Sequence, residues 1–86
     1  MMKNEWLITF RSVTYAQRGE QILQRGKIPC RLQRTPKHLT ERGCGYCLRL
    51  REIDAARAVA LLRRERLQYE KLYSVKEDGS TVEENL

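Results

Sequence analysis

The sequence predicts a ferredoxin-like α+β fold, the split βαβ arrangement in which two helices cover one face of an antiparallel four-stranded sheet. Two observations predict it. Segments with alternating apolar residues, typical of half-buried strands, combine with two segments of helical spacing in the order βαββαβ. The chain of 86 residues also has the length of one domain, which we expect to span residues 1–75.

The first half of the chain predicts a strand, a helix and a second strand. Residues 6–12 alternate between apolar and polar side chains, as a strand with one buried face does. Ser12 or Thr14 is suited to cap the next helix, and Gly26 is expected to end it in a left-handed conformation. The apolar residues of this helix are Ala16, Gly19, Ile22 and Leu23, and the strand after it alternates through Ile28, Cys30 and Leu32.

The second half repeats this order after a polar loop over residues 33–43. The third strand directs Tyr46, Leu48 and Leu50 to the helix-covered face, which places Cys47 and Arg49 on the open face. Asp54 is the expected cap of a helix whose apolar stripe is formed by Ala55, Ala58, Val59 and Leu62. The last strand is expected over residues 69–75.

Charge is distributed unevenly along the chain. Residues 76–86 contain one lysine and four acids, so this segment has a net charge of −3 and is expected to be a disordered acidic tail. The total of +6 then leaves +9 on residues 1–75. A basic body favours acidic partners, although a solvated surface accounts for most of it, and RNA binding is not favoured because no RNP-type motif occurs.

The most distinctive segment surrounds two cysteines, Cys44 and Cys47. A thiolate is the reactive form of cysteine, and a nearby cation or a cluster of backbone N–H groups lowers its pKa. Arg42 supplies a cation, while Gly43 and Gly45 give a flexible turn that a partner can approach. Cys44 is therefore predicted to attack an electrophile or to hold a sulfur-type group.

The C-x-x-C spacing leaves the role of Cys47 open. In an extended strand, residues three apart lie roughly 10 Å apart and point to opposite faces. A disulfide needs Cα atoms within about 7 Å, so the chain must fold back at Gly45 if Cys44 and Cys47 form a redox pair. Lys37 and Arg49 are further candidates to stabilise an anion at this site.

A structural metal is a weaker interpretation of the same residues. Cys30, His38, Cys44 and Cys47 together supply four candidate ligands, but a zinc site usually shows two paired knuckles and here there is one. We therefore expect no metal and no resident cofactor. Cys30 alternates with apolar residues, so it is interpreted as a core residue.

The chain resembles the selenium/sulfur carrier protein-like family over about residues 5–73. The resemblance is carried by Leu7-Ile8-Thr9-Phe10, Ile28-Pro29, Arg31-Leu32, Thr35-Pro36, Cys44-Gly45 and Leu48-Arg49. It implies that Cys44 holds a persulfide or its selenium equivalent for transfer. It also implies a sulfur or selenium donor protein and an acceptor protein as partners.

Three functions follow as alternatives. The first is a thiol carrier that uses Cys44 and Gly45, and such a protein is not a turnover enzyme. The second is a ferredoxin-like binding or regulatory module for an anionic ligand, an acidic protein or RNA. The third is a dithiol redox protein that uses Cys44 and Cys47. The open sheet face suggests a homodimer, and the short apolar N-terminal stretch predicts a cytoplasmic protein without a membrane span.

Overall fold

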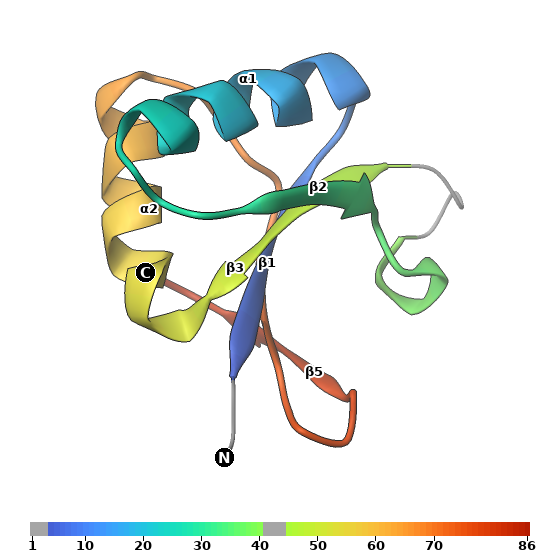
Figure 1. The fold of residues 1–86 in the computed structure, drawn as a ribbon. Coiled ribbons are helices and arrows are strands. Elements are labelled where there is room, and N and C mark those ends of the chain that lie inside the picture. Colours follow the sequence, from blue (N-terminus) through green and yellow to red (C-terminus); the bar gives the residue numbers. More distant parts are fainter. Residues whose placement is uncertain (1–3, 41–44) are drawn as a thin grey trace.

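A computed structural model of the chain describes residues 4–40 and 45–86. Figure 1 shows the described elements as a sheet with two helices. Within the described residues, no helix is long and apolar enough to cross a membrane. In chain order the elements are β1 (Glu5–Phe10), α1 (Val13–Arg25), β2 (Arg31–Arg34), the 3₁₀ turn η1 (Lys37–Leu39), β3 (Tyr46–Arg51), α2 (Glu52–Arg64), β4 (Leu72–Val75) and β5 (Thr81–Glu84).

The sheet is antiparallel throughout and has the order β2-β3-β1-β4-β5. The antiparallel sheet and the two helices agree with the sequence prediction, but the expected count of four strands is wrong. The fifth strand, β5, pairs with β4 along its whole length and lies in the segment that was expected to be a disordered tail from residue 76.

A tight turn explains why this acidic segment forms a strand. Asp78 accepts hydrogen bonds from both the backbone N–H and the hydroxyl of Ser80, at 2.9 and 2.6 Å. Gly79 has φ +87°, which a glycine adopts at no steric cost. Asp-Gly is a strong hairpin signal. Strand β5 contains one aliphatic residue, Val82, so the turn contributes more to its formation than apolar burial does.

The main core lies between the sheet and the two helices. Alternate residues of β1, β3 and β4 face the helices, and the predicted apolar residues of α1 and α2 are all buried against them. Gly19 sets the distance between α1 and the sheet, because a Cβ at this position would lie 2.9 Å from the Phe10 ring and 3.2 Å from Leu48. The helix and the sheet therefore pack closely at this point.

The ends of α1 agree only in part with the prediction. Ser12 caps the helix, since its hydroxyl accepts the backbone N–H of Tyr15 at 3.3 Å. Gly26 does end the helix, but the expectation of a left-handed glycine is wrong, because its φ is −82° and Lys27 takes the left-handed conformation with φ +61°. A Cβ on Gly26 would instead lie 2.5 Å from Leu61, so the glycine accommodates α2.

The start of α2 also differs from the prediction. The cap residue is Arg51, and the predicted cap, Asp54, lies inside the first turn. Asp54 is 7% exposed and forms an ion pair with Arg51, whose Nε lies 2.9 Å from its carboxylate. A carboxylate in the first turn is stabilised by the helix dipole, so this position suits Asp54 without a capping role. Strand β2 starts after Cys30 and β4 starts at Leu72, so both strands are shorter at their N-terminal ends than predicted.

Candidate functional site

The sheet face opposite the helices has a small apolar cluster of its own. Leu7, Cys47 and Tyr73 are buried there, with Leu39 of η1 and Val75 packed against them. Cys47 is therefore on the face that the alternation of β3 predicted. It is fully buried, with 0% of its surface exposed.

The environment of Cys47 disfavours its thiolate. Burial raises the pKa of the Cys47 thiol above its ordinary value, and the side chains of Thr35 and Gln33 and the charge of Arg49 oppose this rise to a smaller extent. The sulfur lies 3.9 Å from the carbonyl oxygen of Arg34, toward which the thiol donates a weak hydrogen bond. A neutral thiol is the form that fits this position.

The predicted anion-binding residue Arg49 already has partners on the sheet. Its Nη1 atom is 2.8 Å from the Glu5 carboxylate, and its Nε atom donates to the side-chain oxygen of Gln33 at 3.2 Å. The Arg49 side chain is 27% exposed, so it remains accessible at one side. Its charge is therefore balanced locally by Glu5, which weakens its attraction for a further anion.

Cys30 lies elsewhere in the molecule. It is half-buried just before β2 and packs against the edge of the helix-side core, so its interpretation as a core residue is confirmed only in part. Burial, followed by the charge of Glu20, raises the pKa of the Cys30 thiol to about 11. Cys30 and Cys47 are both thiols of low reactivity at neutral pH, since the thiolate is the nucleophile.

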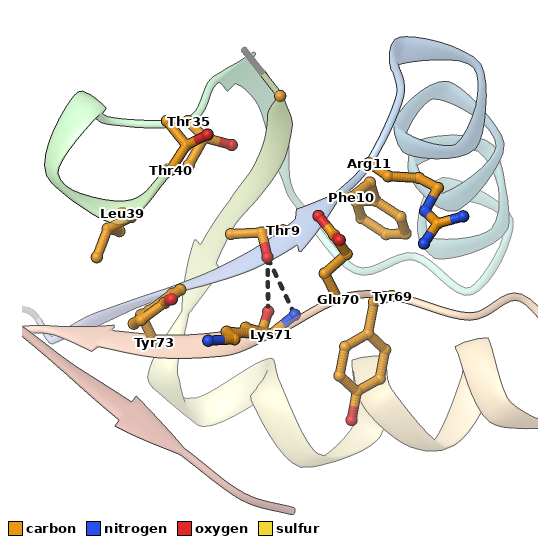
Figure 2. A pocket seen from close by; sticks show the side chains of 11 residues that line it. Thr9, Phe10, Arg11, Thr35, Leu39, Thr40, Tyr69, Glu70, Lys71 and Tyr73 are labelled. Atoms are coloured by element: carbon orange, nitrogen blue, oxygen red, sulfur yellow. Dashed lines mark hydrogen bonds between the residues drawn. The ribbon is translucent and has the colours of Figure 1, made fainter. Parts of the chain in front are cut away.

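A pocket of about 860 Å³ opens where β1 and β4 meet the loop before β3. Figure 2 shows Leu39, Thr35 and Thr40 on one side of it, with Thr9 and Arg11 on the strand side. The residues that line it are Thr9, Phe10, Arg11, Thr35, Leu39, Thr40, Gly45, Tyr69, Glu70, Lys71 and Tyr73. Hydroxyl and charged side chains predominate in this lining, so the pocket suits a polar or charged group better than an apolar ligand.

Gly45 forms the part of this pocket that precedes β3. Its φ is +142°, a conformation that residues with side chains rarely adopt. Its carbonyl oxygen accepts the backbone N–H of Thr35 at 3.1 Å, and a Cβ on Gly45 would lie 3.6 Å from the hydroxyl oxygen of Thr35. The backbone at Gly45 is therefore held against Thr35, and the absence of a side chain leaves the pocket open there.

The hydroxyl of Thr35 is buried at the edge of the same pocket. Within residues 4–40 and 45–86 its Oγ1 atom has no hydrogen-bond partner of ordinary geometry, although it acts on the nearby Cys47 thiol and opposes the rise in its pKa. The neighbouring Thr9 differs, because its hydroxyl accepts from the Lys71 N–H at 3.0 Å and donates to the Lys71 carbonyl at 3.3 Å (Figure 2). An unsatisfied buried hydroxyl is costly, so Thr35 is a residue whose role packing alone does not explain.

The remaining predicted site residues divide into two groups. Arg42, Gly43 and Cys44 lie outside the described residues. Lys37 begins η1, where it is exposed, and it does not line the pocket. His38, the histidine of the zinc alternative, interacts with the Thr81 hydroxyl at 3.2 Å, and the described part of the chain contains no group of three or more His, Cys, Asp or Glu able to hold a metal.

Several pocket residues were not predicted from the sequence. Thr9, Lys71 and Tyr73 come from β1 and from the chain at the start of β4, far from the cysteines in sequence. The available signal was alternation, which assigns Thr9 and Cys47 to the same face of the sheet, where they are direct partners in the β1–β3 register. The strand order that brings β4 beside β1 was needed to add the other two.

Comparisons with known proteins identify a family for this chain. The family model described as Putative Se/S carrier protein-like matches residues 5–74, a stretch that runs from the start of β1 into β4 and includes the Cys44-Gly45 pair. Searches of curated proteins and of solved structures returned no match. The match covers most of the chain, and the chain therefore belongs to the Se/S carrier protein-like family.

Proposed function

We propose that this chain carries sulfur or selenium on Cys44, with the pocket next to Gly45 receiving the donor or acceptor group. The family match over residues 5–74 supports a carrier. We also propose that β1 to β4 with the two helices form a ferredoxin-like arrangement to which β5 adds an edge strand, because the order β2-β3-β1-β4 suits that topology.

One observation carries the choice of Cys44. The two cysteines that the structure describes are both disfavoured as nucleophiles, because burial raises the pKa of Cys30 to about 11 and also raises that of the fully buried Cys47. Cys44 directly precedes the pocket residue Gly45 in the chain. The sequence also places Arg42 close to it, which favours a thiolate.

The transfer needs no change in total oxidation state. The Cys44 thiolate attacks the outer sulfur of a persulfide on a donor protein, a new S–S bond forms to Cys44, and the donor leaves as a thiolate that takes up a proton. A thiolate of the acceptor then attacks the outer sulfur on Cys44, and the carrier returns to its thiolate form. Selenium follows the same steps with a selenium atom in the outer position.

Other residues of the site have supporting roles in this proposal. Arg42 and the backbone N–H groups around Gly43 and Gly45 stabilise the anionic persulfide. Lys37 adds an exposed positive charge in the segment between β2 and β3. Arg49 has a smaller role in this proposal, because its guanidinium already bonds to Glu5 and Gln33 on the neighbouring strands. Cys47 serves as a core residue of the open face, which argues against the dithiol redox function because its sulfur is fully buried.

The other sequence expectations stay predictions. These are the donor and acceptor proteins as partners, the cytoplasmic location, a homodimer through the open face and binding of RNA. That the chain is a carrier and not an enzyme is also part of the proposal. It transfers one sulfur atom from a donor to an acceptor and returns to its starting form only when the acceptor has taken that atom.

Intact-mass analysis of protein purified without reductant tests the proposal. After incubation with a persulfide donor, the wild-type chain should gain one sulfur atom that a reductant removes, and peptide mapping should locate it on Cys44. Cys30→Ser and Cys47→Ser are matched controls that should keep the gain, whereas Cys44→Ser should lose it. A sulfur atom found on Cys30 or Cys47, or no adduct at all, would contradict the proposal.

A further inference from the structure

The two outermost strands of the sheet have opposite charge. Strand β2 contains Arg31 and Arg34, both exposed, and strand β5 at the other edge contains Glu83 and Glu84. An edge strand has unpaired backbone N–H and C=O groups, which can pair with a strand of another chain. Figure 1 shows β2 and β5 on opposite sides of the central strands β3 and β1.

Charge discriminates between the ways in which two copies can meet at these edges. Two β2 strands side by side would gather four arginines at one seam, and two β5 strands would gather four glutamates. Like charges directly opposite one another destabilise a strand pair, whereas opposite charges stabilise it. The unlike edges are therefore the complementary ones.

Strand direction and side-chain facing agree with this pairing. Each strand of the sheet is antiparallel to its neighbour, so β2 and β5, separated by three strands, run in the same direction. A second copy in the same orientation thus places its β5 parallel to β2, with the helices of both copies on the same side. Parallel pairing is slightly less stable than antiparallel pairing, so a weak association is expected.

The register of the two strands matches side chains by type. Leu32 and Arg34 face the helix side because they pair with Leu48 and Tyr46. Val82 and Glu84 face the same side because they pair with Ser74 and Leu72. Aligning the two strands residue by residue sets Leu32 beside Val82, which is 46% exposed, and Arg34 beside Glu84.

We propose that copies of this chain associate head to tail, the β5 edge of one copy pairing in parallel with the β2 edge of the next. The contact joins two different surfaces, so each added copy leaves one β2 edge and one β5 edge free and growth does not stop at a dimer. Repulsion between like charges disfavours pairing of β2 with β2 and of β5 with β5. The association does not involve the sulfur chemistry, and Cys44→Ser should associate as the wild type does.

Sedimentation velocity from 10 µM to 1 mM tests the proposal. The mean mass should rise continuously with concentration and fall on addition of 0.5 M salt, which screens the charge pairs. Arg34→Glu and Glu84→Arg should each raise the dissociation constant about tenfold, a loss of roughly 1.4 kcal/mol. The double variant Arg34→Glu/Glu84→Arg should restore association, because positions 34 and 84 of neighbouring copies again have opposite charges.

Circular dichroism of each variant establishes that the fold is kept, and Arg18→Glu on the exposed surface of α1 is a charge-reversal control that should associate normally. A chain that is monomeric at 1 mM would overturn the proposal. So would an association that stops at two copies, or single reversals that leave the mass unchanged.

Discussion

The sulfur of Cys47 lies 3.9 Å from the carbonyl oxygen of Arg34, across the β2–β3 pair and beneath the loop that contains Leu39. This contact places a thiol inside the small apolar cluster on the open face of the sheet. Of the two cysteines of the C-x-x-C segment, Cys47 thus behaves as a packed side chain. The reactive chemistry of the segment is accordingly assigned by our proposal to Cys44.

Alkylation should separate the cysteines by rate. At pH 8 and under native conditions, Cys47 should stay unmodified by iodoacetamide because its sulfur is fully buried and its pKa is raised. Cys30 should react slowly, and its rate should rise up to about pH 11. Under the proposed function Cys44 should react fastest, and peptide mapping gives all three rates. Fast modification of Cys47 in the folded protein would contradict the described packing.

The raised pKa of Cys30 predicts a loss of stability in alkali. Its pKa of about 11 in the folded state exceeds the ordinary value of 9.0, so folding favours the neutral thiol. This contribution is fully present below pH 9.0, and it is lost as the pH rises through 9.0 toward 11 because the unfolded chain releases its proton first. Urea unfolding of wild type and Cys30→Ala should therefore converge between pH 8 and 10.5. The comparison is needed since lysines and tyrosines titrate in the same range, and a constant difference between the two proteins would exclude this effect.

Alanine substitutions at Gly45 and Gly79 distinguish the effect of backbone strain from the effect of a side chain added to the pocket. Both have positive φ, +142° and +87°, so alanine at either position should cost about 1–3 kcal/mol of strain. A Cβ at Gly45 would contact Thr35 and the Phe10 carbonyl oxygen at 3.6 Å, whereas a Cβ at Gly79 would have nothing within 4 Å. Under the proposed function, Gly45→Ala should slow sulfur loading at least about tenfold and Gly79→Ala should not. Equal loading of the two variants by intact mass would remove Gly45 from the site.

The regular elements could be predicted because the periodicity of apolar residues determines which faces are buried. The stripes of α1 and α2 agree with the burial found, and alternation gave the correct facing in β1 and β3. The expectation that β1 buries one face only is wrong, because Trp6 to Phe10 are all buried and Leu7 joins the small cluster on the open face. The fifth strand was not predicted, because its pairing depends more on the Asp78-Gly79 turn than on the apolar content of the strand. Local propensity also assigned the left-handed conformation after α1 to the wrong residue. Lys27 adopts this conformation, whereas Gly26 is a glycine because a Cβ there would be too close to Leu61.

The candidate site was predicted less completely, for a physical reason. Cys44 and Gly45 were singled out from their chemistry, and Cys44 stays a prediction because it lies outside the described residues. A pocket, in contrast, is formed by residues that only the strand order brings together. Lys71 reaches the pocket because β4 pairs with β1, and Thr35 reaches it because its N–H bonds to Gly45. Neither pairing follows from the spacing of residues along the chain.

Two glycines test how closely the helices pack. Replacing glycine by alanine lowers the conformational entropy of the unfolded chain, and this effect alone should stabilise both Gly19→Ala and Gly26→Ala by about 0.4–1 kcal/mol. At Gly19 the new Cβ would lie 2.9 Å from the Phe10 ring inside the core, and overpacking of this kind costs about 1–3 kcal/mol. At Gly26 the obstacle is the end of the half-buried Leu61 side chain, which can turn away. Urea unfolding should thus show Gly19→Ala destabilised relative to Gly26→Ala, and the reverse order would contradict the helix-sheet distance.

The two buried threonines of the pocket give a matched pair of substitutions. Thr9→Val removes a hydroxyl that bonds to both backbone groups of Lys71, so it should lower the free energy of unfolding by about 1–3 kcal/mol. Thr35→Val removes a buried hydroxyl that has no hydrogen-bond partner of ordinary geometry among the described residues and interacts there with the Cys47 thiol, so it should be close to neutral in urea unfolding.

The same Thr35→Val variant tests whether the hydroxyl belongs to the sulfur site. If it does, sulfur loading should fall while stability is kept, and the pKa of Cys47 should rise further because Thr35 opposes that rise in the wild type. Thr14→Val on the exposed surface of α1 is a control that should change neither quantity. Unchanged loading together with a large loss of stability would show instead that Thr35 has a structural partner and no part in the transfer.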